Sequence, residues 1–145
     1  MAYKYIPRFL ENYNQTGLGI DYNFKASGIF TTNYDNNQQA IANLKNLLLT
    51  AVGERYHNVQ FGSKLPYIIF EPNVYELKED ISEIIFSAVS QWLPYINITG
   101  IDTVTGEDDP NLNHNIQITI RFTTNSIDES KIVIFAEENG ILTIE

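Results

Sequence analysis

The sequence predicts an α+β fold in which two helices pack on a small antiparallel sheet, after an irregular N-terminal arm. Two helical stretches come first along the chain, and short stretches of alternating apolar and polar residues follow them. The chain has 145 residues, of which 43% are hydrophobic, so it can bury one core. We therefore expect a single domain over residues 1–145, with the arm at 1–34 and the α+β core at 35–145.

The arm is rich in aromatic residues and has no clear helical or strand period. Pro7 and several glycines interrupt it. So aromatic a segment is not typical of a free tail. We expect the arm to lie either on its own domain or on a neighbouring protein, and the sequence leaves both possibilities open.

The first helix is predicted over residues 36–52. Asp35 is expected to cap it, with Gln38 as the partner in a capping box. Gly53 is expected to follow the helix as its C′ residue. The apolar residues of this stretch recur at helical spacing, and they are Ile41, Leu44, Leu47, Leu48 and Ala51.

The second helix is predicted between Asn73, as its cap, and Pro94, which stops it. Its apolar stripe consists of Leu77, Ile81, Ile84, Ile85, Ala88 and Trp92. Phe86, Val89 and Leu93 broaden that stripe, so both sides of the helix are expected to be covered. Between the two helices, Tyr67 to Phe70 is predicted to form a short strand.

Four strands are predicted after the second helix. Their ranges are 96–104, 115–123, 131–136 and 141–144. Gly100 indicates a bulge in the first of them. Asn139-Gly140 is the sequence signal of a tight hairpin between the last two.

The charge of the chain argues against two classes of partner. The net charge is −9, and the nine Lys and Arg residues are scattered. Nucleic acids and anionic membranes are bound by clustered cations, so we expect neither nucleic-acid binding nor membrane insertion. The absence of cysteine excludes disulfides and thiol chemistry.

The sequence offers little that resembles catalysis, so we expect no catalytic residue, no cofactor and no metal. His57 and His114 both fall in predicted loops, where solvated side chains are the simpler interpretation. The acidic residues 107–109 lack the spacing of an EF-hand loop. No phosphate-binding loop and no nucleophile elbow occurs.

One enzymatic alternative is a peptidoglycan-degrading, lysozyme-like glycosidase. The candidate carboxylates are Glu11, Glu54, Glu71 and Asp80. Glu71 and Asp80 have the spacing of the Glu and Asp of phage-type lysozymes, but Phe86 stands where those enzymes have a Thr. Spacing alone carries this alternative, because a glycosidase needs two carboxylates facing each other across a cleft. A free adaptor protein is a further alternative.

The central block from Leu47 to Asn73 carries a more specific signal. It contains Leu-Leu-x-Thr, Gly-Glu-Arg, Phe-Gly and Phe-Glu-Pro in order, the last three being Gly53, Glu54, Arg55, Phe61, Gly62, Phe70, Glu71 and Pro72. In order and spacing this block resembles the baseplate-wedge family of contractile phage tails, which has relatives in type VI secretion baseplates and some members once labelled lysozymes. We also expect Arg55 to bond Glu71 or the backbone at Phe61-Gly62 and so to fix the loop.

The resemblance implies a structural, non-enzymatic subunit of a virion tail baseplate that is assembled in the host cytoplasm. It implies a ring of copies around the tail tube, with wedge proteins and the sheath protein as partners. After the second helix the family typically carries Glu-Pro-Arg, associated with docking on the wedge. Here the stretch reads Trp92-Leu93-Pro94-Tyr95, without either charge. We expect a wedge interface at these residues, with the Trp92 indole in the core.

The resemblance also implies a platform for the sheath, whose subunits interlock by exchanging strands. An open sheet edge can accept such a strand through backbone hydrogen bonds. We expect this edge in the C-terminal strands, with Lys131, Ile132, Val133, Ile134, Ile141, Leu142, Thr143 and Ile144 as the sheath interface.

Overall fold

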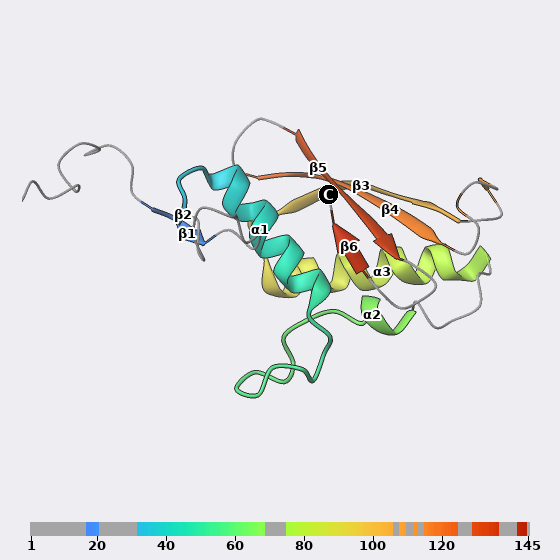
Figure 1. The fold of residues 1–145 in the computed structure, drawn as a ribbon, viewed down its shortest axis with the longest axis horizontal. Helices are drawn as coiled ribbons and strands as arrows, with labels where there is room; N and C mark the ends of the chain where they lie inside the picture. Colours follow the sequence, from blue (N-terminus) through green and yellow to red (C-terminus); the bar gives the residue numbers. More distant parts are fainter. Residues whose placement is uncertain are drawn as a thin grey trace, which may run out of the picture.

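The computed structural model describes residues 17–20, 32–68, 75–105, 108–109, 112, 115–124, 129–136 and 142–144. The α+β prediction is confirmed: helices lie on one side of a four-stranded sheet (Figure 1). In chain order the elements are β1 (Gly19–Ile20), β2 (Thr32–Asn33), α1 (Asn36–Leu49), α2 (Leu65–Ile68), α3 (Tyr75–Trp92), β3 (Asn97–Val104), β4 (Ile116–Thr123), β5 (Glu129–Ala136) and β6 (Leu142–Ile144).

The main sheet has the strand order β3-β4-β5-β6, and every neighbouring pair is antiparallel. β4 and β5 pair along their whole length, from Ile116 opposite Ala136 to Thr123 opposite Glu129. β6 is much shorter and pairs only with Ile134, Phe135 and Ala136. Among the described strands, residues 129–133 of β5 therefore have no partner on the side where β6 lies.

The core lies between the helices and the inner face of this sheet. Alternate residues of β4 are buried, as period-two strands with one covered face require. The largest fully buried side chains are Leu44, Leu47, Leu48, Leu65, Leu77, Ile81, Ile85, Ile118, Ile120, Phe122, Ile132 and Ile134. Burying each of them contributes about 1.5–3 kcal/mol of transfer free energy, so this cluster supplies the main driving force for folding.

The ends of α1 differ from the prediction. The helix ends at Leu49 rather than Val52, and Thr50 Oγ1 donates to the Asn46 carbonyl at 2.6 Å. Asp35 occupies the N-cap position, but its side chain makes no capping hydrogen bond, so the predicted capping box does not form. Gly53 has a positive φ of 96°, yet it lies too far beyond the helix to be its C′ residue.

The strand predicted from Tyr67 to Phe70 is wrong where the structure describes it, because residues 65–68 form the short helix α2. The Ser63 hydroxyl accepts the backbone N–H of Leu65 at 3.2 Å and starts the turn. Leu65 and Ile68 are both buried, and their three-residue spacing suits a helical turn better than a strand.

The apolar stripe of α3 is confirmed, but the helix is covered more narrowly than predicted. Leu77, Ile81, Ile85 and Val89 are buried against the core. Phe86 is 60% exposed, so the expectation that both sides are covered is wrong at this residue. The predicted cap, Asn73, lies outside the described residues.

The bulge predicted at Gly100 is confirmed. The pairing of β3 with β4 shifts register between Ile98 and Gly100. A Cβ atom on Gly100 would lie 2.9 Å from the guanidinium of Arg121, which pairs with Asp102 at 2.8 Å. The Asn139-Gly140 turn lies outside the described residues.

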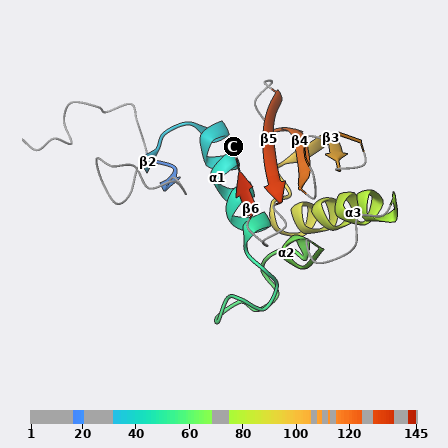
Figure 2. The same ribbon diagram turned by 45° about the vertical axis from the view of Figure 1, so that its right-hand side comes forward.

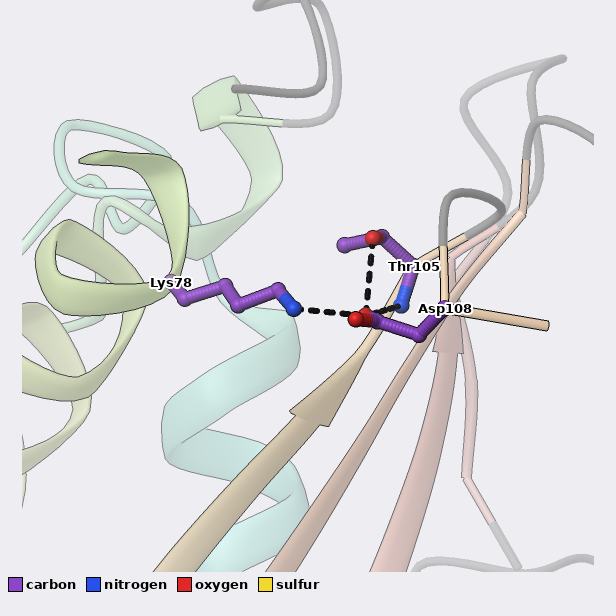
Figure 3. A network of polar contacts seen from close by, with 3 residues as sticks. All are labelled: Lys78, Thr105 and Asp108. Atoms are coloured by element: carbon purple, nitrogen blue, oxygen red, sulfur yellow. Dashed lines mark hydrogen bonds and ion pairs between the residues drawn. The ribbon is translucent and has the colours of Figure 1, made fainter. Parts of the chain in front are cut away.

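A polar network ties α3 to the loop that follows β3 (Figure 3). Lys78 Nζ forms an ion pair with Asp108, and the same carboxylate oxygen accepts the backbone N–H and the hydroxyl of Thr105, both at 3.0 Å. These hydrogen bonds lower the pKa of Asp108 to about 2, with the bond from Lys78 as the largest cause. The network fixes the end of β3 relative to the first half of α3.

The described part of the N-terminal arm lies on its own domain. β1 and β2 pair as a two-stranded antiparallel sheet, and the Leu18 N–H donates to the Asn33 carbonyl at 2.8 Å. Asn33 is buried, and its side chain donates to Gln39 of α1 at 3.1 Å. The hairpin is therefore attached to the first half of α1.

Candidate protein interface

The Gly-Glu-Arg and Phe-Gly motifs lie in one loop that projects from the end of α1, away from the sheet (Figures 1 and 2). Its two ends are joined by a parallel bridge between Ala51 and Ser63. The Ser63 N–H donates to the Thr50 carbonyl at 2.9 Å, and the Gly53 N–H donates to the Val59 carbonyl at 2.8 Å. These bonds hold the base of the loop while residues 53–60 stay exposed.

Gly62 is required where the loop returns to the helices. Its φ is +126°, and a Cβ atom there would lie 2.5 Å from the Thr50 carbonyl oxygen. The next residue, Ser63, is buried and donates its hydroxyl to the Leu48 carbonyl at 2.9 Å. A side chain at position 62 would separate these two segments.

Glu54 and Arg55 both act within the fold. Glu54 Oε2 accepts the backbone N–H of Ala51 at 3.0 Å, which closes the turn after α1. Arg55 donates to Asn46 Oδ1 at 3.2 Å, and its guanidinium carbon lies 3.8 Å from the centre of the Phe61 ring. Arg55 therefore contacts Asn46 and the Phe61 ring instead of the predicted backbone at Phe61-Gly62. Glu71, the other predicted partner, lies outside the described residues together with Phe70 and Pro72.

Phe61 connects the loop to the end of α3. Its ring meets the Trp92 ring edge to face, with centroids 5.3 Å apart. Trp92 is half-buried and packs against the core, as expected for its indole. The side chains of Arg55, Phe61 and Trp92 thus form one stack. This stack joins the Gly-Glu-Arg and Phe-Gly motifs to the start of the predicted wedge interface.

The four residues Trp92-Leu93-Pro94-Tyr95 do not share one surface. Leu93 is buried, with its N–H bonded to the Val89 carbonyl at 2.8 Å, while Pro94 is exposed. Tyr95 is 38% exposed, and its hydroxyl accepts a hydrogen bond from Asn43 of α1 at 2.7 Å. Pro94 and Tyr95 are therefore the members of this segment that a partner can reach.

The predicted sheath interface is also divided. Ile132 and Ile134 are buried in the core, so their side chains are unavailable to a partner. Lys131 is exposed and Val133 is half-exposed. Leu142, Thr143 and Ile144 form β6 at the end of the strand order, and Ile141 lies outside the described residues. On this strand of the predicted interface, the side chains of Lys131 and Val133 are therefore the ones that a partner can reach.

The carboxylates proposed for a glycosidase are not assembled in the described part of the chain. Glu54 is bonded within its own turn, and Asp80 is exposed on α3. Within the described ranges, no group of three or more His, Asp or Glu side chains is arranged to hold a metal ion. His57 lies at the exposed tip of the loop, edge to face with Tyr56 at 5.3 Å. None of the helices that the structure describes has the length and apolar character needed to cross a membrane.

The described part of the chain is thus an α+β domain whose sheet is covered by helices, with the Gly-Glu-Arg and Phe-Gly motifs in a loop that hydrogen bonds hold at its base. The family described as Baseplate wedge protein gp25 matches residues 36–128, most of the chain, and this chain belongs to that family. It is a family of structural baseplate proteins.

A solved structure supports the fold. The chain is similar to a Geobacter sulfurreducens protein described as a candidate tail lysozyme, with a TM-score of 0.58 and 19% sequence identity. The match covers 71% of this chain and 92% of the other. At this identity the likeness establishes the fold and not an activity. Among curated proteins, none matches the chain.

Proposed function

We propose that this chain is a structural subunit of a contractile tail baseplate wedge that docks on neighbouring wedge proteins and provides the platform for sheath assembly. Copies form a ring around the tail tube in the virion baseplate, after assembly in the host cytoplasm. Residues 1–145 act as one domain in this role. One observation carries the proposal: in a chain of the baseplate wedge family, residues 129–133 of β5 have no partner among the described strands on the side where β6 lies.

The sheath side of the proposal rests on strand pairing. β6 pairs with β5 only from Ile134 to Ala136, so among the described strands residues 129–133 have no partner on the side where β6 lies. A sheath strand that enters here runs antiparallel to β5 and gains backbone hydrogen bonds worth about 0.5–1.5 kcal/mol each. The outer edge of β6 offers a second place for a strand.

The wedge side of the proposal rests on Pro94 and Tyr95, which are exposed beside α1. Neither residue carries a charge, so docking here uses packing and hydrogen bonds rather than the charge-assisted bonds that a Glu and an Arg make.

Co-purification with the sheath protein encoded beside this chain tests the proposal, with electron microscopy of the product. We expect rings or short sheaths that grow from a platform containing the chain. Deleting residues 138–145 removes β6 and so distinguishes the two edges: loss of sheath recruitment with wedge binding retained would mean that the sheath strand needs β6, whereas retained recruitment would mean that it pairs with β5. Undiminished recruitment by the truncated chain would show that the last strand is not used, and no association by the full chain would contradict the platform role.

A further inference from the structure

A second feature of the surface adjoins Tyr95. A hollow of about 400 Å³ opens where β1, the first half of α1 and the turn after α3 meet. Leu18 and Ala40 supply apolar parts of its wall, and Asn36, Gln39, Asn43 and Tyr95 supply polar parts. None of the described residues that line it is charged, although the chain carries a net charge of −9.

The polar wall is ordered by a chain of side-chain hydrogen bonds. Asn33 donates to Gln39 at 3.1 Å, and Gln39 donates to Asn43 at 2.8 Å. Asn43 in turn donates to the Tyr95 hydroxyl at 2.7 Å. This series of hydrogen bonds starts at the buried Asn33 and ends at the exposed Tyr95. The orientation of each side chain is therefore set by its neighbour before any partner binds.

The same groups keep capacity for a partner. A carboxamide has two N–H donors and an oxygen with two lone pairs, and a phenol can donate as well as accept. Gln39 and Asn43 each use one N–H donor in these hydrogen bonds, and the Tyr95 hydroxyl acts as an acceptor. Each of these residues therefore has a donor left, and Asn36 adds a further carboxamide to the wall. Donors and acceptors together match the two polar groups of a peptide unit.

From the described part of the arm, Leu18 beside β1 lines the hollow. Leu18 is 46% exposed and is held in place by its backbone bond to Asn33. Gly19 lies so close to the Gln39 carboxamide that a Cβ atom there would collide with it. The hairpin therefore packs directly on the polar wall.

We propose that the hollow binds an extended, uncharged peptide segment of a neighbouring wedge protein. The peptide groups of that segment pair with Gln39, Asn43 and Tyr95, and one apolar side chain packs against the exposed Leu18. A charged segment would lose hydration without meeting an opposite charge among the described lining residues, which is unfavourable. The inference rests on the proposed wedge role, and it identifies the site and the chemistry of that contact.

The test compares two acidic substitutions on one helix. Asn43→Asp places a charge in the hollow and removes the donor to Tyr95, whereas Gln38→Glu makes a matching change of charge at an exposed position outside it. Affinity for the purified wedge proteins encoded beside this chain is measured for both variants at low and high salt. We expect Asn43→Asp to bind at least about tenfold more weakly, which corresponds to about 1.4 kcal/mol. We expect Gln38→Glu to bind like wild type, and wild-type affinity to change little with salt.

Tyr95→Phe removes only the hydroxyl and serves as the second variant if Asn43→Asp fails to fold. It should also weaken binding, and circular dichroism confirms that each variant is folded. Wild-type affinity in a folded Tyr95→Phe or Asn43→Asp variant would overturn the inference and leave the wedge role intact.

Photo-cross-linking from position 18 identifies the occupant. A cross-linked peptide from an uncharged segment of a wedge protein supports the inference. A cross-link to a second copy of this chain, or to its own residues, overturns it. Failure of the wild-type chain to bind any wedge protein would contradict the proposed function itself, which distinguishes the two failures.

Discussion

The guanidinium carbon of Arg55 lies 3.8 Å from the centre of the Phe61 ring, and the Trp92 ring meets the same Phe61 ring edge to face. Arg55 and Phe61 stand at opposite ends of a loop, and Trp92 ends a helix that follows much later in the chain. This stack is therefore the link between the projecting loop and the segment that leads to Pro94 and Tyr95. It explains physically why an Arg and an aromatic residue occur together in this loop.

Arg55→Ala should lower the free energy of unfolding by about 0.5–1 kcal/mol, because an exposed cation–π contact contributes about that much. For a chain of this size the melting temperature should fall by about 2–4 °C. Differential scanning calorimetry measures both quantities. Lys64→Ala removes a nearby exposed cation and is the matched control for the loss of charge. An unchanged melting curve for Arg55→Ala would count against a stabilising role for the contact.

Gly62→Ala should destabilise the protein by about 2–3 kcal/mol, because it adds backbone strain at positive φ to a collision with the Thr50 carbonyl. Gly53→Ala is the matched comparison: it has a φ of +96° and no atom within 4 Å of the added Cβ. Strain alone should cost about 1 kcal/mol there. Urea denaturation of both variants measures the difference. Equal losses of stability would show that the approach to Thr50 does not matter.

Asp108 should contribute less to stability as the solution becomes more acidic. Hydrogen bonds from Lys78 and Thr105 lower its pKa from an ordinary 3.8 to about 2. Because the pKa is lowered in the folded state, the contribution of Asp108 to the free energy of unfolding is present above pH 3.8 and is lost as the pH falls towards 2. A carboxyl NMR titration measures the pKa directly, and Lys78→Gln should raise it. A wild-type titration midpoint near 3.8 would mean that the network in Figure 3 does not persist in solution.

No clearing zone is expected when the wild-type chain is run in a peptidoglycan zymogram beside an active lysozyme. Glu54, one of the candidate carboxylates, is committed to the backbone of Ala51, and the family is structural. The variants Glu54→Gln and Glu71→Gln should look the same as wild type. Clearing by wild type that either variant loses would instead favour the glycosidase alternative.

Local sequence patterns determined much of this protein. The strict alternation in residues 116–122 is enough to predict β4 and its buried face, because a strand with one covered side has period two. The stripe in α3 and the bulge at Gly100 follow from spacing in the same way. The family was also readable from the order of short motifs around Gly53 and Gly62, and the match over residues 36–128 confirms it.

Other features depend on contacts between residues that are far apart in the chain. Tyr67 and Ile68 were predicted to start a strand and instead lie in α2, because burial of Leu65 and Ile68 on the core outweighs the weak β propensity of so short a stretch. Phe86 continues the apolar pattern of α3 and is nevertheless 60% exposed, so the packing of the described elements leaves it uncovered.

The predicted wedge and sheath interfaces also depend partly on local sequence and partly on tertiary contacts. The sequence by itself determined that the segment at 92–95 is aromatic and uncharged, and that strands end the chain. Only the tertiary structure decided that Leu93 points inward, that Tyr95 bonds Asn43, and that β6 stops short of residues 129–133. The physical reason is that a periodic pattern specifies which face of an element is buried, whereas the partner across that face is selected by packing of the whole chain.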